Sequence, residues 1–188
     1  NWNRILRFQP RVDYTPTVWL TTVNTAEVLV NYTVYDFEDQ IQSVRSFSFR
    51  QAAWSDSTSL RIGKRIQMTF QGGVRIYERG VLKWREFKER PEHYFVEQSY
   101  WPQVTIGVTD FVVLGAGYRF FSQARYRYEG RTRRFERRVS SAGPTAALAW
   151  SGHHGRSVSI EGWRETQSDE KGGARTFSNL SITVGMAL

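Results

Sequence analysis

The 188-residue chain contains no cysteine, which excludes disulfide scaffolds, thiolate zinc sites and cysteine nucleophiles. Long apolar runs are also missing. A transmembrane helix needs about 20 consecutive apolar residues, and the longest clean apolar stretch, 111–118, is far shorter. Only three histidines occur, and neither an H-E-x-x-H motif nor a glycine-rich phosphate loop is present. We therefore expect no catalytic residue, no metal site and no cofactor, and a protein that is not an enzyme.

Acidic residues are fewer than basic ones, at 18 against 26, so the net charge is +8 and the isoelectric point is near 10.0. Mean hydropathy is only −0.51, although 40% of the residues are hydrophobic and 15% are aromatic. Apolar residues must therefore be spread among polar ones rather than gathered into runs. A high aromatic content also argues against disorder, because disordered chains are poor in aromatic and β-branched residues.

Period-two alternation dominates the chain, and helical spacing is almost absent. The clearest alternation covers 60–76, where the even positions are mostly apolar and the odd positions are polar or basic. Such alternation predicts a strand with one apolar and one polar face. If the side chain of Lys64 reaches a lipid headgroup, the apolar band covers 66–76, which matches the roughly 9–11 residues of a tilted transmembrane strand.

Turn signals divide the chain into about nine predicted strands. Compact turns are expected near 15–16, 55–58, 109–110 and 152–155, and longer polar loops at 36–42, 88–93, 129–134 and 168–173. The two kinds alternate, as in an antiparallel meander with short turns on one side and longer loops on the other. We expect one domain over 1–188. An odd strand count with a first strand entering from outside predicts the C-terminal portion of a larger barrel.

The end of the chain carries the most specific signal. Residues 180–188 read Leu-Ser-Ile-Thr-Val-Gly-Met-Ala-Leu, an alternating apolar strand with Gly185 and a terminal Leu188 in place of the usual aromatic. With the alternation elsewhere, this resembles Gram-negative outer-membrane β-barrel proteins, in particular the C-terminal part of large transporter-type barrels. The resemblance implies an all-β antiparallel transmembrane β-barrel in the cell outer membrane, acting in transport, as a pore, or as an envelope component of a larger assembly.

Arginines on the polar faces are the main candidates for function. Four are expected on one face of the predicted strand at 60–76 and its continuation, and three on another strand. They are Arg61, Arg65, Arg75 and Arg79, then Arg119, Arg125 and Arg127. These guanidinium groups could attract anionic solutes or bind lipopolysaccharide phosphates, or could form salt bridges in the lumen with Glu97, Glu161 and Glu165. The net positive charge predicts that some stay unpaired.

Tryptophan and tyrosine gather near the expected strand ends. The set is Trp2, Trp84, Tyr94, Tyr118, Tyr126, Tyr128 and Trp150. Amphipathic rings prefer the headgroup region of a bilayer, so this set predicts aromatic girdles at the membrane interface. The alternative is a soluble or secreted β-sandwich binding module that hides the same rings and its apolar face in a core.

A basic run covers 131–138 and places five arginines within eight residues. Such a run can bind nucleic acid, but none of the standard nucleic-acid motifs accompanies it, and we expect no nucleic-acid partner. On a barrel the run falls at an external loop, where lipopolysaccharide phosphates lie. The expected partners are outer-membrane lipid, lipopolysaccharide and other envelope proteins. His153 and His154 are expected in a surface turn.

Overall fold

The computed structural model describes residues 1–36, 45–86, 88–152, 156–170 and 172–185. His153, His154, Leu188 and most of the loop predicted at 36–42 lie outside these residues. The elements are β1 (Trp2–Phe8), β2 (Arg11–Thr17), β3 (Leu20–Val34), β4 (Phe47–Ile62), β5 (Ile66–Lys83), the 3₁₀ helix η1 (Trp84–Glu86), β6 (Lys88–Gly107), β7 (Val112–Glu129), β8 (Thr132–Ser151), β9 (Ser157–Asp169) and β10 (Gly173–Gly185).

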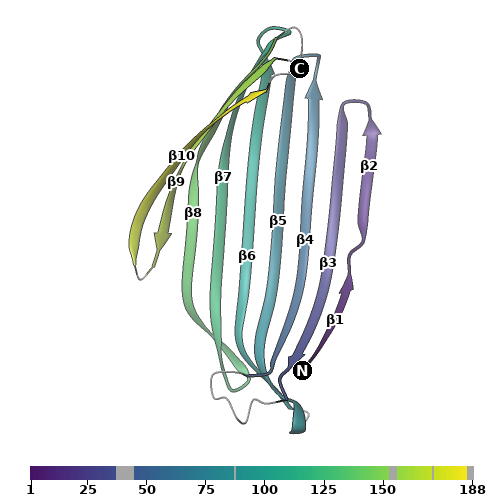
Figure 1. The fold of residues 1–188 in the computed structure, drawn as a ribbon, viewed down its shortest axis with the longest axis vertical. Coiled ribbons are helices and arrows are strands. Elements are labelled where there is room, and N and C mark those ends of the chain that lie inside the picture. Colours follow the sequence, from purple (N-terminus) through teal and green to yellow (C-terminus); the bar gives the residue numbers. More distant parts are fainter. Residues whose placement is uncertain (37–44, 87, 153–155, 171, 186–188) are drawn as a thin grey trace.

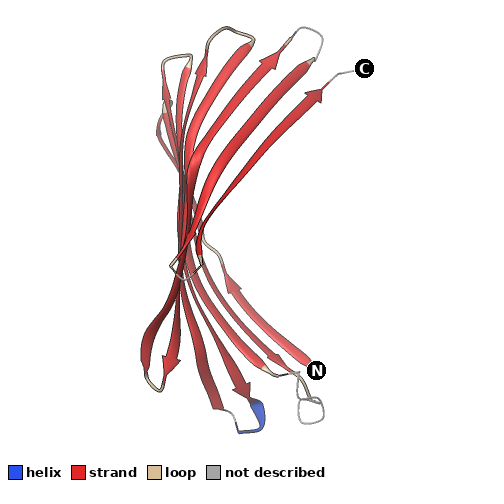
Figure 2. Cartoon of the chain, turned by 90° about the vertical axis from the view of Figure 1, so that its left-hand side faces the viewer, coloured by secondary structure: helices blue, strands red, loops and turns tan. Residues whose placement is uncertain are grey.

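One twisted sheet contains all ten strands, in the order β1-β3-β4-β5-β6-β7-β8-β9-β10, with β2 also paired to β3 (Figure 1). Every pairing is antiparallel. The expected all-β antiparallel meander is therefore confirmed. The sheet does not close into a barrel, because no pairing among the described residues joins β1 or β2 to β10. An open sheet agrees with the expectation that the chain is only a portion of a larger barrel. Seen from the side, the molecule is a single twisted layer (Figure 2).

Strands β1 and β2 are two halves of one edge strand, which explains ten strands where about nine were predicted. Phe8 pairs with Val28 and Arg11 pairs with Thr25, so the register against β3 continues unchanged across the break. Pro10 lies in this gap and has no N–H to donate. Proline in a sheet is largely confined to edge strands and bulges, and the interruption here falls on an edge.

The stretch 60–76 is a hairpin and not the single strand predicted. Strand β4 ends at Ile62, β5 begins at Ile66, and Gly63 adopts a positive φ of 64° in the turn between them. Ile62 pairs with Ile66. A three-residue turn keeps even positions on the same face in both strands, so the alternation runs through the turn and conceals it. The predicted apolar band at 66–76 lies wholly within β5.

Two other predicted connections also lie inside strands. The compact turn expected at 55–58 belongs to β4, and the loop expected at 88–93 belongs to β6. Serine, aspartate and charged residues favour turns locally, but here all of them except Glu92 pair with β5 in the ladder. The basic run 131–138 likewise lies mostly in β8 and not in a loop. A register shift opposite Arg125 and Tyr126 accommodates it.

The sheet has almost no hydrophobic core. Among the described residues, Val34 and Ala124 are the only buried hydrophobic ones. The accessible surface is 13484 Å², against about 9,300 Å² expected for a compact protein of this mass. No second sheet packs over this one in the described part of the chain. The residues that the alternation separates are therefore displayed on two open faces.

Candidate functional site

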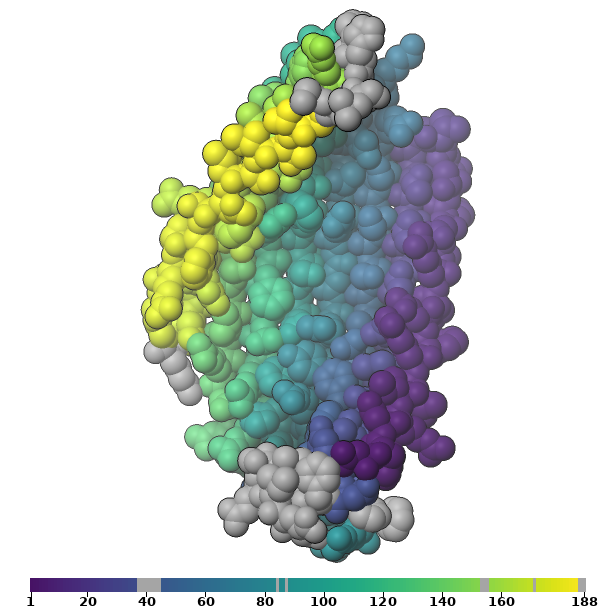
Figure 3. Space-filling model, viewed as in Figure 1, coloured from purple at the N-terminus to yellow at the C-terminus, as the bar shows by residue number. Residues whose placement is uncertain are grey.

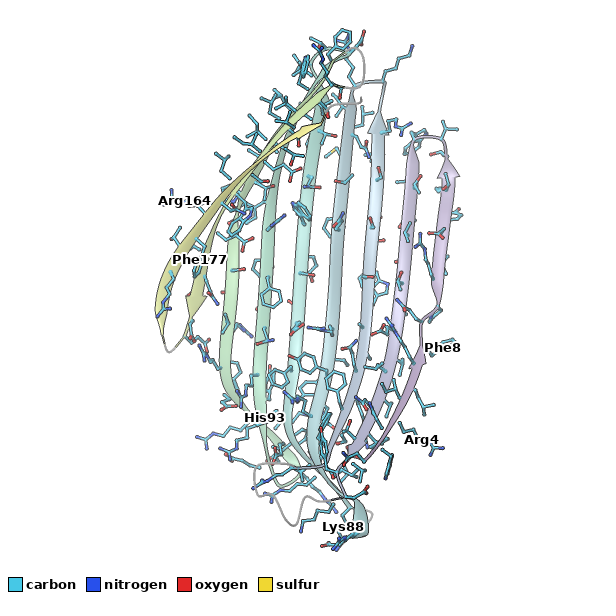
Figure 4. The ribbon with its side chains drawn as sticks, viewed as in Figure 1. Arg4, Phe8, Lys88, His93, Arg164 and Phe177 are labelled. Atoms are coloured by element: carbon cyan, nitrogen blue, oxygen red, sulfur yellow. The ribbon has the colours of Figure 1, made fainter. Side chains whose placement is uncertain are left out.

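The first candidate site is the even face, defined as the face that carries Phe70 and the other even-numbered residues of β5. Strand register joins one even-face row of aliphatic side chains across seven consecutive strands: Ile62, Ile66, Ile106, Leu114, Leu148, Ile160 and Ile182. Phe70, Ile76 and Leu180 also lie on this face and are exposed. Arg4 and Phe8 project from the β1 edge (Figure 4). An exposed apolar surface this wide marks a contact with lipid or protein.

Two shallow apolar depressions mark the upper half of the even face. One, of about 530 Å³, lies over β6–β10 and is lined by Val104, Leu114, Leu148 and Leu180, among others. The other, of about 600 Å³, lies over β4–β7 beside Phe70. Below them the rings of Phe70, Tyr100 and Phe120 form a ladder with centroid separations of 6.3 and 6.0 Å. The even face is thus most apolar between the upper turns and this aromatic ladder.

Polar side chains interrupt the even face at two places. On β3 and β4, the Asp56 carboxylate accepts hydrogen bonds from the Thr22 and Thr58 hydroxyls at 2.8 and 2.9 Å. Below the aromatic ladder, register places Gln98 beside Ser122. On β7 the uninterrupted apolar stretch runs from the start of the strand to Phe120, which is about nine residues and within the range for a tilted transmembrane strand.

The lower end of the even face carries a charged and aromatic cluster. The Arg133 guanidinium lies 3.8 Å from the Tyr94 ring centroid and donates to the Tyr128 hydroxyl at 2.8 Å. The Tyr128 hydroxyl donates to Glu78, and Arg50 forms ion pairs with Glu78 at 3.8 Å and with Glu89. Cation–π contacts hold such guanidinium groups against rings. Charge is therefore concentrated at one end of this face.

The predicted girdle residues reach both ends of the sheet but do not all lie at strand ends. Trp2 begins β1 and Trp150 lies near the end of β8, while Tyr126 and Tyr128 lie near the end of β7. Tyr118 lies inside β7 opposite Pro144, and Tyr94 lies inside β6 and Trp84 in η1. Tyr94 and Tyr126 pair directly, with ring centroids 6.0 Å apart.

The second candidate site is the odd face, which carries the odd-numbered residues of β5. Register places Arg75, Arg79, Arg119, Arg125 and Arg127 on it. The prediction that four arginines share one strand is wrong, because β4 carries Arg61 and the hairpin turn carries Arg65. That turn divides the supposed strand. Arg61 still shares the odd face, because it pairs with Gln67.

Glu97 is the most buried carboxylate described, with 7% of its surface exposed, and lies at the centre of an odd-face network. The Arg75 Nε donates to Glu97 Oε2 at 2.6 Å. The Tyr77 hydroxyl and the Gln123 amide both donate to Glu97 Oε1, at 3.0 and 2.6 Å. Three donors from the two neighbouring strands, β5 and β7, thus compensate for the burial of the charge. The predicted pairing of Glu97 with an arginine is confirmed.

The remaining odd-face arginines divide into paired and unpaired groups. Arg119 lies 4.0 Å from Glu165. Arg125 lies 2.8 Å from Glu136 and 2.6 Å from the His93 ring nitrogen. Within the described residues, Arg61, Arg79 and Arg127 form no ion pair, and neither does Glu161. The odd face therefore keeps uncompensated positive charge, with Arg79 and Arg127 in register on either side of His93.

The lower turn between β5 and β6 carries exposed charge. Lys88 lies at the lower end of the sheet (Figure 4), with its Nζ 3.2 Å from Glu86 Oε2. The hydrogen bond from Lys88 and the charges of Lys83 and Lys88 hold the pKa of the Glu86 carboxyl below its ordinary value. This carboxylate is fully exposed, so it makes little difference to the stability of the fold.

Sequence reasoning missed the residues that form a groove in the middle of the odd face. The groove has a volume of about 630 Å³ and includes Ser99, Trp101, Arg119, Phe121 and Glu165 in its lining. Only Arg119 and Glu165 were among the candidates, because arginines and their acidic partners are conspicuous in a sequence. The serines and Trp101 become a site only when strand register places them side by side.

Comparison with known proteins does not assign this chain to a family. No family model matches it, and no curated protein sequence resembles it significantly. In the described ranges, no helix is long and apolar enough to cross a membrane. No group of three or more His, Cys, Asp or Glu side chains that could hold a metal ion occurs in those ranges. The two faces of the sheet therefore carry the functional argument.

Proposed function

We propose that this chain forms part of the wall of a membrane-spanning β-barrel of the outer membrane, acting in transport or as a pore. The even face contacts lipid and the odd face lines a polar interior. One observation carries the proposal: aliphatic side chains, most of them exposed, form a row across seven strands, while the opposite face is mainly polar. Lipid-facing and lumen-facing residues alternate in the same way along the strands of such barrels.

The dimensions of the apolar band support this assignment. On β5 the band runs from Ile66 to Ile76, and the next even-face residue, Glu78, belongs to the charged cluster at the lower end. Such a stretch, tilted by about 45°, rises about 25 Å, which is the height of the apolar band in outer-membrane barrels. The longest strands continue below the band, where the aromatic and arginine cluster suits a headgroup region with anionic phosphates.

The open edges support a larger barrel. The path from β1 to β10 contains nine successive antiparallel strands, so the two edge strands run in the same direction (Figure 1). These edge strands lie on opposite margins of the molecule (Figure 3). If β1 paired directly with β10, the new pair would be parallel. The same holds if identical copies in the same orientation were joined edge to edge, because each β10 would pair with a β1 that runs in the same direction. An all-antiparallel barrel therefore needs an odd number of further strands between these two edges. Unpaired edge groups would otherwise cost several kcal/mol each in lipid.

Thiol labelling in native membranes tests the assignment of the faces. Because the chain has no cysteine, each introduced cysteine is the only thiol within it. A water-soluble maleimide should label Gln67→Cys and Thr69→Cys, and should leave Met68→Cys and Phe70→Cys unlabelled. A lipid-soluble maleimide should label the second pair. The two pairs are matched because they alternate along one strand.

Two results would overturn the proposal. If the water-soluble reagent labels Met68→Cys and Phe70→Cys as fast as the other two positions, the even face does not contact lipid. If the protein stays in the supernatant after membranes are sedimented, the alternative of a soluble or secreted binding module is favoured, and its partner must then cover the even face.

A further inference from the structure

We propose that the odd-face groove binds a neutral saccharide, such as one ring of an oligosaccharide. The inference rests on the proposed function, in which the odd face lines an aqueous interior. The groove spans β3–β9 at mid-height and has a volume of about 630 Å³, which is in the range of small-molecule sites. None of its residues belongs to the Glu97 network described above.

Small side chains form the floor of the groove. Register aligns Ser55, Gly73 and Ser99 in one row across β4, β5 and β6, and Ser141 extends it on β8 beyond Phe121. Larger side chains line the same groove, from Gln71 and Trp101 beside this row and from Phe121 within it. The hollow therefore results from a run of small residues between large ones.

Trp101 supplies both a flat surface and an unused donor. Its indole Nε1 is shielded from solvent but has no hydrogen-bond partner. A buried donor without a partner is uncommon in folded proteins and indicates a missing water or ligand. The Arg119 guanidinium lies 4.2 Å from the indole centroid and stabilises the ring in this position. The indole N–H is thus a donor that the described residues leave unsatisfied at the wall of the groove.

The charges in the groove favour a neutral ligand. Arg119 faces Glu165 at 4.0 Å, which is too long for a tight ion pair, and Glu165 accepts only a weak bond of 3.4 Å from Ser141. The two charges balance, so an anion would be attracted by Arg119 but repelled by Glu165. Sugar hydroxyls both donate and accept, and therefore can use the carboxylate, the guanidinium and the serine hydroxyls together. The C–H face of a pyranose ring packs on an aromatic plane.

Saccharide titration of the full protein in detergent or lipid nanodiscs tests the inference. The probes are maltotriose and N-acetylglucosamine, with acetate and phosphate as anionic comparisons, and binding is measured by calorimetry and by saturation transfer to the sugar protons. Trp101→Phe keeps the ring and removes the N–H, so the affinity for saccharide should fall on the order of tenfold. Ser99→Leu should abolish binding by filling the floor.

The matched control is Trp54→Phe, which alters an exposed tryptophan of the even face and should leave the affinity unchanged. Circular dichroism checks that each variant folds. Absence of saccharide binding, an affinity unchanged by Trp101→Phe and Ser99→Leu, or tighter binding of acetate or phosphate than of either sugar would each overturn the inference. The labelling pattern at 67–70 is independent of the groove, so failure here is distinguishable from failure of the proposed barrel.

Discussion

Glu97 illustrates how a single residue of the odd face depends on neighbours distant in sequence. Its carboxylate is almost fully buried and accepts hydrogen bonds from Arg75, Tyr77 and Gln123. A buried charge is tolerated only when partners compensate for lost hydration. The arrangement locks β5, β6 and β7 together on the face where no hydrophobic core is available to do so.

Glu97→Gln should therefore destabilise the protein. The amide cannot accept at both oxygen positions, so at least one of the three donors loses its partner, at a cost of about 1–3 kcal/mol. The free energy of unfolding in urea, measured in lipid, checks this. Glu161→Gln is the control, because Glu161 is exposed on the same face and forms no ion pair among the described residues. Equal stability of the two variants would contradict the role assigned to the network.

At the scale of the element, β8 and β9 approach closely at Gly143. A Cβ at this position would collide with the backbone carbonyl oxygen of Arg164 and with the Cα of Glu165. Backbone cannot move aside as a flexible side chain can. Gly143 neighbours Pro144, and the ladder between β8 and β9 has no paired residues at these two positions. Gly143 is therefore required because the two strands approach closely, and not because the chain turns there.

Gly143→Ala should separate β8 from β9 and destabilise the sheet by at least about 1–3 kcal/mol, the usual range for overpacking. Urea unfolding gives the total effect, and hydrogen exchange of the amides at 139–151 locates it. In the control, Gly162→Ala, the nearest atom is the Leu180 side chain at 3.4 Å, and this flexible neighbour can shift. A variant at Gly143 as stable as wild type would show that the two strands separate at little cost.

At the scale of the whole molecule, the odd face combines neutral polar residues, paired charges and a few arginines without acidic partners. Arg79 and Arg127 lie in register on either side of His93. Because Glu97 compensates Arg75 and Glu136 compensates Arg125, the net positive potential of this face comes mainly from the unpaired groups. A pore lined in this way attracts anions.

If the complete barrel conducts, its reversal potential in a salt gradient should indicate a preference for anions. The double substitution Arg79→Gln and Arg127→Gln should weaken that preference, and Lys88→Gln, at the lower end of the sheet, should change it little. The preference should also weaken as salt approaches 1 M, where the Debye length is about 3 Å. A preference for cations in the wild-type protein would contradict this distribution of charge.

The amino-acid sequence alone determined the two-faced strands and their antiparallel meander, because side-chain alternation is a local property with a period of two residues. The apolar band at 66–76 follows from that alternation alone. The same alternation concealed the turn at Gly63, since a three-residue turn leaves the parity of positions unchanged.

Only the tertiary structure decided which residues meet across strands. The partners of Glu97 lie 20 to 26 residues away in sequence, and the groove beside Trp101 collects side chains from seven strands. The structure also decided that the two edges remain unpaired. Register and edge pairing are set by hydrogen bonds and packing between distant segments, and no single segment of this sequence contains that information.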